Sequence, residues 1–398
     1  MSVATSQAQV YLRLVQQLRP IWRSDQALPA KIQRLLASER RFGSRDRRLY
    51  RELIYTTLRY LPWIEPWLER EPARAAKVAA WLAAATRDTR AYRAEICGDW
   101  PVADSLAARA KFLEADPAAL LPAWFSDECP VVFTPAELSA QLARAPLWLR
   151  LQTDDEARVA DEFDQKAWRV TPSPALPSAW KVLDEADVTQ SVAYAKGLIE
   201  IQDLGSQFVL ESIGVEPGGR WLDACAGAGG KTLQLARLVG SDGAVTAHDI
   251  RPEALDELLD RADRAGLENV QTVASPSGTY DGVLVDAPCS GSGTWRRSPH
   301  LKWTTTPAAV AERADLQREL LARFSAHVRP GGLLAYATCS LSRRENEDVV
   351  EAFLLRHPDF RREKLARTFG FTTASEAITI LPARHDTDGF HVALLRRR

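Results

Sequence analysis

The pattern of hydrophobic and polar positions changes twice along the chain. Up to about residue 128, apolar residues recur at i, i+3, i+4 and i+7, which is the period of an amphipathic helix. The clearest stretches are VYLRLVQQL, PAKIQRLLASE, RDRRLYRELIYTTLRYLPWIEPWL and AAKVAAWLAAAT. We therefore expect an all-α domain over residues 1–128.

Residues 131–200 have the pattern of a small mixed unit. PLWLRLQ, AWRVT, WKVLDE and GLIEIQD alternate like half-buried strands, whereas DDEARVADEFDQ and DVTQSVAYAK have the helical period. The order predicts a small α/β module. RNA-binding proteins often contain modules of this size, but so do many others.

From residue 201 to residue 398, strand-like runs alternate with longer helical stretches. The expected strands are RWLDAC, GAVTAHD, NVQTVA, DGVLVDAP, GLLAYATC and the terminal FHVALLRRR. This alternation is typical of a parallel sheet covered by helices on both faces. We predict an α/β, doubly wound, mostly parallel Rossmann-like domain here.

The composition is that of an ordinary globular chain. Hydrophobic residues make up 46% of the 398 positions and charged residues 26%, and no run of about 18 uncharged apolar residues occurs. The five cysteines form no CxxC pair, which argues against a zinc site and a disulfide framework. We expect a cytoplasmic monomer with free thiols, no metal and no membrane partner.

The net charge of −1 conceals a basic N-terminal region. Residues 1–60 contain 12 Lys and Arg against 4 Asp and Glu. Arginine suits phosphate and base edges, so the cluster is a candidate RNA-binding face, with a solvated helix face as the alternative. The cluster consists of Arg40, Arg41, Arg45, Arg47, Arg48 and Arg51, and we select Arg45, Arg47 and Arg48 for testing.

A glycine-rich turn follows the first expected strand of the last domain, where residues 221–232 read WLDACAGAGGKT. A phosphate-binding P-loop needs glycine where Cys225 stands, and the dinucleotide motif GxGxxG is absent. A loop for S-adenosylmethionine (SAM) and a purely structural turn are the remaining alternatives. Asp249 ends the second expected strand, where a carboxylate can accept both hydroxyls of a ribose.

Two cysteines follow neighbouring expected strands, in Asp286-Ala287-Pro288-Cys289 and in Thr338-Cys339-Ser340. The carboxyl ends of adjacent parallel strands open into one crevice, so we expect both thiols beside one cofactor. A thiolate that adds to carbon 6 of a pyrimidine makes carbon 5 able to take a methyl group, and a nearby acid assists. The alternative for each cysteine is a small buried apolar side chain.

These motifs closely resemble those of the RNA cytosine-5 methyltransferases. Over about residues 200–398 the resemblance rests on QDLGSQFV, DACAGAGGKT, DAPCSGSGTWRRSPHLKW, YATCSLSRRENEDVV and DGFHVALLRR. FGSRDRRLYRELIYTTLRYLPW is similar to the NusB-like domain of the bacterial 16S ribosomal RNA enzymes of the Sun/Fmu type. The intermediate module occupies the place of their small RNA-binding domain.

The resemblance implies a role for each motif. Cys339 would be the nucleophile, Cys289 would assist product release, and Asp286 would contact the cytosine. Ser275 stands where the family usually has an acid; its hydroxyl can hydrogen-bond adenine but carries no charge. Independently of the resemblance, Arg296, Arg297 and Lys302 follow the Cys289 loop, so we expect them at the mouth of the site in contact with RNA phosphates, with a solvated loop as the alternative. SAM would be held by Cys225, Ala226, Gly227, Ala228, Gly229, Gly230, Lys231, Asp249, Ser275 and Asp286.

We therefore predict SAM-dependent methylation of carbon 5 of a cytosine in ribosomal RNA, with 16S as the expected substrate, through a covalent bond to Cys339. A transfer RNA enzyme of the same mechanism is one alternative. A non-catalytic RNA-binding or assembly factor that retains the fold is another. An RNA-dependent ATPase is disfavoured by Cys225 at the required P-loop glycine.

Overall fold

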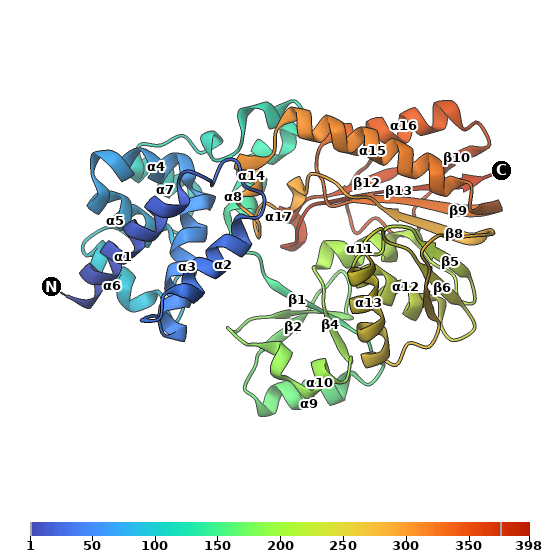
Figure 1. The fold of residues 1–398 in the computed structure, drawn as a ribbon, viewed down its shortest axis with the longest axis horizontal. Helices are drawn as coiled ribbons and strands as arrows, with labels where there is room; N and C mark the ends of the chain where they lie inside the picture. Colours follow the sequence, from blue (N-terminus) through green and yellow to red (C-terminus); the bar gives the residue numbers. More distant parts are fainter. Residues whose placement is uncertain (1, 375) are drawn as a thin grey trace. The chain divides into compact units, whose positions relative to one another are not determined.

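The computed structural model of the chain describes residues 2–374 and 376–398 (Figure 1). The chain divides into two compact units. The first contains the chain up to Arg144 together with Thr294–Thr306, and the second contains Ala145–Gly293 and Pro307–Arg398. The helical unit therefore continues beyond the boundary expected near residue 128, and the small module belongs to the same unit as the large sheet.

The first unit is helical, as its sequence pattern predicts. Its helices begin at recognisable signals: Pro72 opens α5, and the carboxylate of Asp46 accepts a hydrogen bond from the Gly43 amide at the start of α3. The unit contains α1 (Val3–Leu18), α2 (Leu28–Ser38), α3 (Ser44–Arg59), α4 (Leu61–Arg70), α5 (Pro72–Leu82), α6 (Arg90–Cys97), α7 (Leu106–Leu113), α8 (Pro135–Leu142) and α14 (Leu301–Thr304).

The second unit begins with a four-stranded antiparallel sheet in the order β2-β3-β1-β4. All four strands fall where alternation predicts them, and we call residues 147–201 the small module. Its elements are β1 (Leu147–Leu151), α9 (Glu156–Gln165), β2 (Val170–Pro172), β3 (Ala179–Val182), α10 (Val192–Ala195) and β4 (Ile199–Ile201).

The large sheet of the second unit has the order β11-β12-β13-β9-β8-β5-β6-β7, with β10 paired to β13. The five strands from β7 to β9 are parallel, and β13 joins them antiparallel to β9. The strands are β5 (Arg220–Asp223), β6 (Ala244–Ala247), β7 (Val270–Thr272), β8 (Tyr280–Asp286), β9 (Val328–Thr338), β10 (Phe360–Glu363), β11 (Thr373–Ala374), β12 (Ala377–Ile380) and β13 (Phe390–Arg397).

Both faces of this sheet are buried. The neighbouring residues Val283 and Leu284 are fully buried in two different hydrophobic clusters, as a strand between two helical layers requires. The helices are α11 (Leu204–Ile213), α12 (Gly230–Val239), α13 (Pro252–Arg264), α15 (Pro307–Ser325), α16 (Glu347–Arg356) and α17 (Pro382–His385). The prediction of a doubly wound, Rossmann-like domain is confirmed.

The six strands expected from the sequence in this domain are present, whereas β10, β11 and β12 were not predicted from the hydrophobic pattern. Among the residues described, no helix combines the length and the apolar character needed to cross a membrane.

Candidate active site

The order of the parallel strands reverses between β5 and β8, which makes this the switch point of the sheet. β6 and β7 lie on one side of β5, and β8 and β9 lie on the other. At such a switch point the loops that follow the two neighbouring strands run in opposite directions. The carboxyl ends of these strands then border a ligand crevice. The loops after β5, β6, β8 and β9 carry the residues that the sequence selects for cofactor binding and catalysis.

The glycine loop connects β5 to α12. Gly227 and Gly229 have φ of 52° and 89°, a conformation that favours glycine. A Cβ added at Gly229 would lie 2.7 Å from Leu258, whereas one at Gly230 would meet nothing within 4 Å. The loop is therefore closely packed on the side of α13 and open at Gly230, where α12 begins.

Asp249 lies two residues beyond β6 and contacts the glycine loop directly. Its Oδ2 accepts the amide of Gly227 at 2.8 Å, and its Oδ1 lies 3.0 Å from the Arg251 guanidinium. Burial raises the pKa of Asp249, but the hydrogen bonds from Arg251 and Gly227 outweigh burial and lower it overall. A carboxylate has about four acceptor positions, so an ionised Asp249 can still accept ribose hydroxyls.

Lys231 and Asp286 form an ion pair between the first turn of α12 and the end of β8. The Nζ–Oδ2 distance is 2.7 Å, and the Lys231 side chain is 9% exposed against 28% for Asp286. Burial alone would lower the pKa of Lys231, but the charge of Asp286 raises it, so the lysine stays protonated. Nearby, burial raises the pKa of Asp223 to about 7, although the Thr232 hydroxyl donates to that carboxyl at 2.7 Å.

The two predicted cysteines are neighbours. Cys289 follows β8, Cys339 follows β9, and their sulfur atoms lie 3.3 Å apart. Both side chains are partly exposed. The hydrogen bond with Cys339 and burial raise the pKa of Cys289 well above its ordinary value, which keeps Cys289 in the thiol form beside its partner.

Glu345 joins the two cysteine loops and was not predicted. It is fully buried and accepts the Ser290 amide at 2.8 Å and the Gln317 side-chain amide at 3.0 Å. Its other oxygen accepts the hydroxyls of Ser290 and Ser340, the residues that follow Cys289 and Cys339. One carboxylate therefore holds the residues that follow both cysteines, the backbone and hydroxyl of Ser290 and the hydroxyl of Ser340.

Two further residues predicted to bind the cofactor lie in different surroundings. Cys225 is partly exposed at the start of the glycine loop, and burial raises its pKa, which favours an unreactive thiol. Ser275 is exposed in the loop between β7 and β8.

The arginine cluster of the helical unit is mostly exposed, but two members make internal contacts. Arg48 forms an ion pair with Asp88 at 2.6 Å while keeping 53% of its side chain exposed. Arg47 donates to the Leu36 carbonyl at 3.1 Å. Arg45 is exposed at the start of α3. The RNA-binding role of Arg45, Arg47 and Arg48 stays a prediction.

The role expected for Arg296 and Lys302 is wrong for this structure, because both side chains are only 1% exposed. Arg296 donates to the carbonyl of Arg144, and Lys302 donates to those of Arg59 and Leu120 at 2.8 and 3.1 Å. The lysine thereby satisfies the carbonyl end of α3, where the helix dipole favours a donor. Neither group is available to a phosphate, whereas Arg297 is exposed.

Comparison with known proteins gives the family context. Residues 212–396 match the family described as 16S rRNA methyltransferase RsmB/F. A Synechocystis protein named "Probable ribosomal RNA small subunit methyltransferase B" is 37% identical over 53% of this chain and 50% of its own length. Ribosomal RNA small subunit methyltransferase B of Klebsiella pneumoniae is 33% identical over 66% of this chain. The match spans 62% of the Klebsiella protein's length.

Solved structures share the fold. The crystal structure of PH0851 covers 100% of both chains with a TM-score of 0.76 at 21% identity. A methyltransferase homolog protein from Pyrococcus horikoshii covers 66% of this chain and 90% of its own, with a TM-score of 0.57 and 28% identity.

Proposed function

We propose that this chain, which belongs to the RsmB/F family of 16S ribosomal RNA methyltransferases, methylates carbon 5 of a cytosine in ribosomal RNA through a covalent bond to Cys339. The observation that carries the proposal is the pair of sulfur atoms 3.3 Å apart at the ends of β8 and β9. Asp286, the last residue of the same strand β8, forms the ion pair with Lys231.

The cofactor is S-adenosylmethionine, and the residues at the switch point fit it. When bound, it supplies the electrophilic methyl group. Asp249 offers a charged acceptor for ribose hydroxyls beside the Gly227 amide. The loop Cys225–Lys231 offers backbone at close range because a side chain is missing at Gly227, Gly229 and Gly230.

The cysteines divide the reaction into two steps. The Cys339 thiolate bonds to carbon 6 of the ring, and the electron pair of the carbon 5–carbon 6 double bond moves to carbon 5, which takes the methyl carbon. Transfer of the carbon 5 proton to a water molecule restores the double bond and expels Cys339 as a thiolate. Cys289, held as a thiol, stabilises that departing thiolate by a hydrogen bond.

Asp286 contacts the cytosine base during the addition. Its carboxylate is bonded to Lys231 on one side and remains partly exposed. It can accept a hydrogen bond from the amino group of the cytosine and orient the ring. The target must be unstacked from its helix for a thiol to reach carbon 6. Arg45, Arg48 and Arg297, which are exposed, and the half-buried Arg47 would hold the RNA phosphates.

Mapping of 5-methylcytosine tests this proposal. We expect the purified chain with SAM to modify a cytosine in 16S ribosomal RNA, and Cys339→Ala to modify none while still binding SAM. If only transfer RNA is modified, the assigned substrate is wrong but the proposed mechanism still holds. A fully active Cys339→Ala variant would refute the assigned nucleophile.

A further inference from the structure

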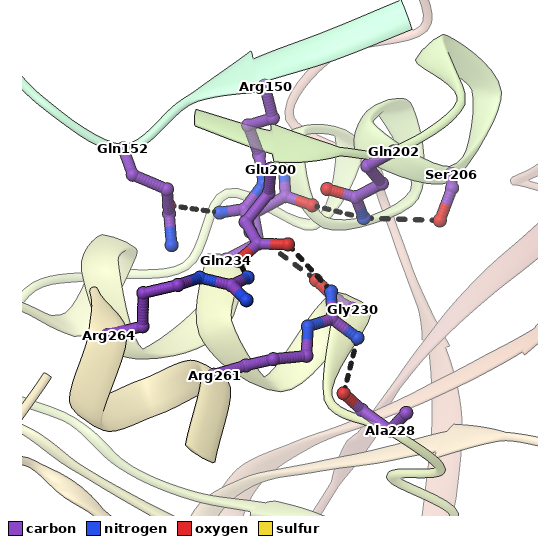
Figure 2. Close-up of polar contacts among 10 residues, drawn as sticks. All are labelled: Arg150, Gln152, Glu200, Gln202, Ser206, Ala228, Gly230, Gln234, Arg261 and Arg264. Carbon is purple, nitrogen blue, oxygen red and sulfur yellow. Dashed lines mark hydrogen bonds and ion pairs between the residues drawn. The ribbon is translucent and has the colours of Figure 1, made fainter. Parts of the chain in front are cut away.

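A buried polar cluster connects the small module to the glycine loop (Figure 2). Glu200 on β4 has a side chain only 3% exposed, and its two oxygens lie 2.8 Å from Arg261 Nη2 and 2.7 Å from Arg264 Nη2. Both arginines belong to α13, one turn apart. The other terminal nitrogen of the Arg261 guanidinium, Nη1, donates to the carbonyl of Ala228 in the glycine loop.

The carbonyl that Arg261 contacts belongs to the peptide between Ala228 and Gly229. At the other end of this peptide, the Gly229 amide donates to the Ala226 carbonyl at 3.0 Å. A peptide next to glycine can rotate because both signs of φ are accessible there. Hydrogen bonds at both ends therefore fix the orientation of this peptide, one residue before α12 begins.

The end of α13 that carries the two arginines packs closely on the small module. A Cβ added at Gly197 would lie 2.5 Å from the Cα of Ala265, so the backbones nearly touch. The guanidinium of Arg264 lies 4.4 Å from the ring centre of Tyr194, also in the module. The module thus holds the helix from which Arg261 reaches the loop.

Arg150 is a third arginine close to Glu200. It is the cross-strand partner of Glu200 on β1, is 4% exposed, and places one guanidinium nitrogen 3.5 Å from the Gly230 carbonyl. Burial lowers the pKa of Arg150 to about 9 while Glu200 opposes the shift. Buried arginines gathered in this way need a carboxylate, since their charges otherwise repel.

We propose that Arg261, oriented by Glu200, is a positioning residue of the cofactor loop, and that the small module thereby supports binding of SAM. The inference rests on the proposed function for the identity of the cofactor. It assigns to the module a task beyond the RNA contact expected from its sequence.

A matched pair of variants tests the inference. Arg261→Met and Arg264→Met each remove one ion pair with Glu200 from the same helix, but only Arg261 reaches the glycine loop. For Arg261→Met we expect the dissociation constant of SAM, measured calorimetrically on the full chain, to rise about ten-fold or more. We expect its KM for SAM to rise equally, with kcat at saturating SAM preserved. Arg264→Met should stay within about two-fold of the parent chain.

Equal weakening by both variants would overturn the inference, because it would trace the effect to the general stability of α13. Unchanged affinity in folded Arg261→Met would also overturn it. Amide hydrogen exchange of residues 226–231 without ligand gives an independent readout, which should be faster in Arg261→Met and not in Arg264→Met. If the parent chain fails to bind SAM, the proposed function fails, while exchange still decides whether Arg261 holds the loop.

Discussion

The continuous segment from Asp286 to Thr306 has two halves with opposite environments. Asp286–Gly293 belongs to the unit of the large sheet, and its polar groups meet Lys231, Cys339 and Glu345. Thr294–Thr306 belongs to the helical unit and buries the side chains of Arg296 and Lys302 there. Sequence proximity to Cys289 therefore does not place a residue beside the two sulfur atoms.

The physical difference lies in the partners of the charges. The basic residues of the second half lie between two tryptophans, Trp295 and Trp303, and Trp295 packs on Phe125 with ring centres 4.5 Å apart. The Lys302 side chain is itself buried, so its ammonium needs acceptors, and it donates to the carbonyls of Arg59 and Leu120. A basic run flanked by tryptophans can thus be a packing segment rather than a phosphate-binding surface.

Truncation of Trp295 should have the largest effect on stability. Trp295 is 1% exposed, so Trp295→Ala removes a buried aromatic side chain and leaves a cavity. We expect a loss of about 3–5 kcal/mol in the unfolding free energy of the helical unit, measured by denaturant titration. The exposed neighbour Arg297→Gln is the control and should change it by less than about 0.5 kcal/mol. Equal stabilities of the two variants would contradict the division of the segment.

Neutralising Glu345 tests the first half of the segment. Glu345→Gln replaces an acceptor of four hydrogen bonds by a group that can accept on one side only, so the cysteine loops lose their common anchor. Loss of charge-assisted hydrogen bonds should lower kcat about 10- to 100-fold, with SAM affinity unchanged. Glu351→Gln, an exposed change on α16, is the control. A kcat equal to that of the parent chain would show that the anchor does not matter.

The smallest effect is expected on the helical surface. Replacing Arg45, Arg47 and Arg48 together by Gln should weaken RNA binding and reduce the slope of log affinity against log salt by about 1 to 2. The slope should change by less than the loss of three full phosphate contacts would cause, because Asp88 already forms an ion pair with Arg48. Turnover at saturating RNA should change little. An unaltered salt slope would make the cluster a solvated helix face.

The sequence predicts the strand-end residues well because their positions follow from local pattern and sheet topology. The glycine loop, Asp249, Cys289 and Cys339 each follow an apolar run, and parallel strands bring such ends together. Contacts between distant segments are not encoded in this way. The sequence gives no periodic signal that Glu345 bridges both cysteine loops or that Glu200 lies 61 positions from its partner Arg261.

The same limit explains the misplaced basic residues. A count of charges predicts exposure for Arg296 and Lys302, since isolated buried cations are costly. Burial becomes favourable only through carbonyls contributed by residues far away in the chain, such as Arg59. Trp295 and Trp303 on either side were the available sign that this segment packs inward.

Trapping of the covalent intermediate tests the central claim most directly. Cys289→Ala keeps the nucleophile but removes the thiol 3.3 Å from it, so the first step should proceed and the release should stall. We expect Cys289→Ala, incubated with RNA and SAM, to give a shifted band on a denaturing gel that nuclease treatment removes, and Cys339→Ala to give none. An adduct from Cys339→Ala and none from Cys289→Ala would reverse the assignment of the two cysteines. No adduct from either variant, with SAM still bound, would contradict covalent catalysis by this chain.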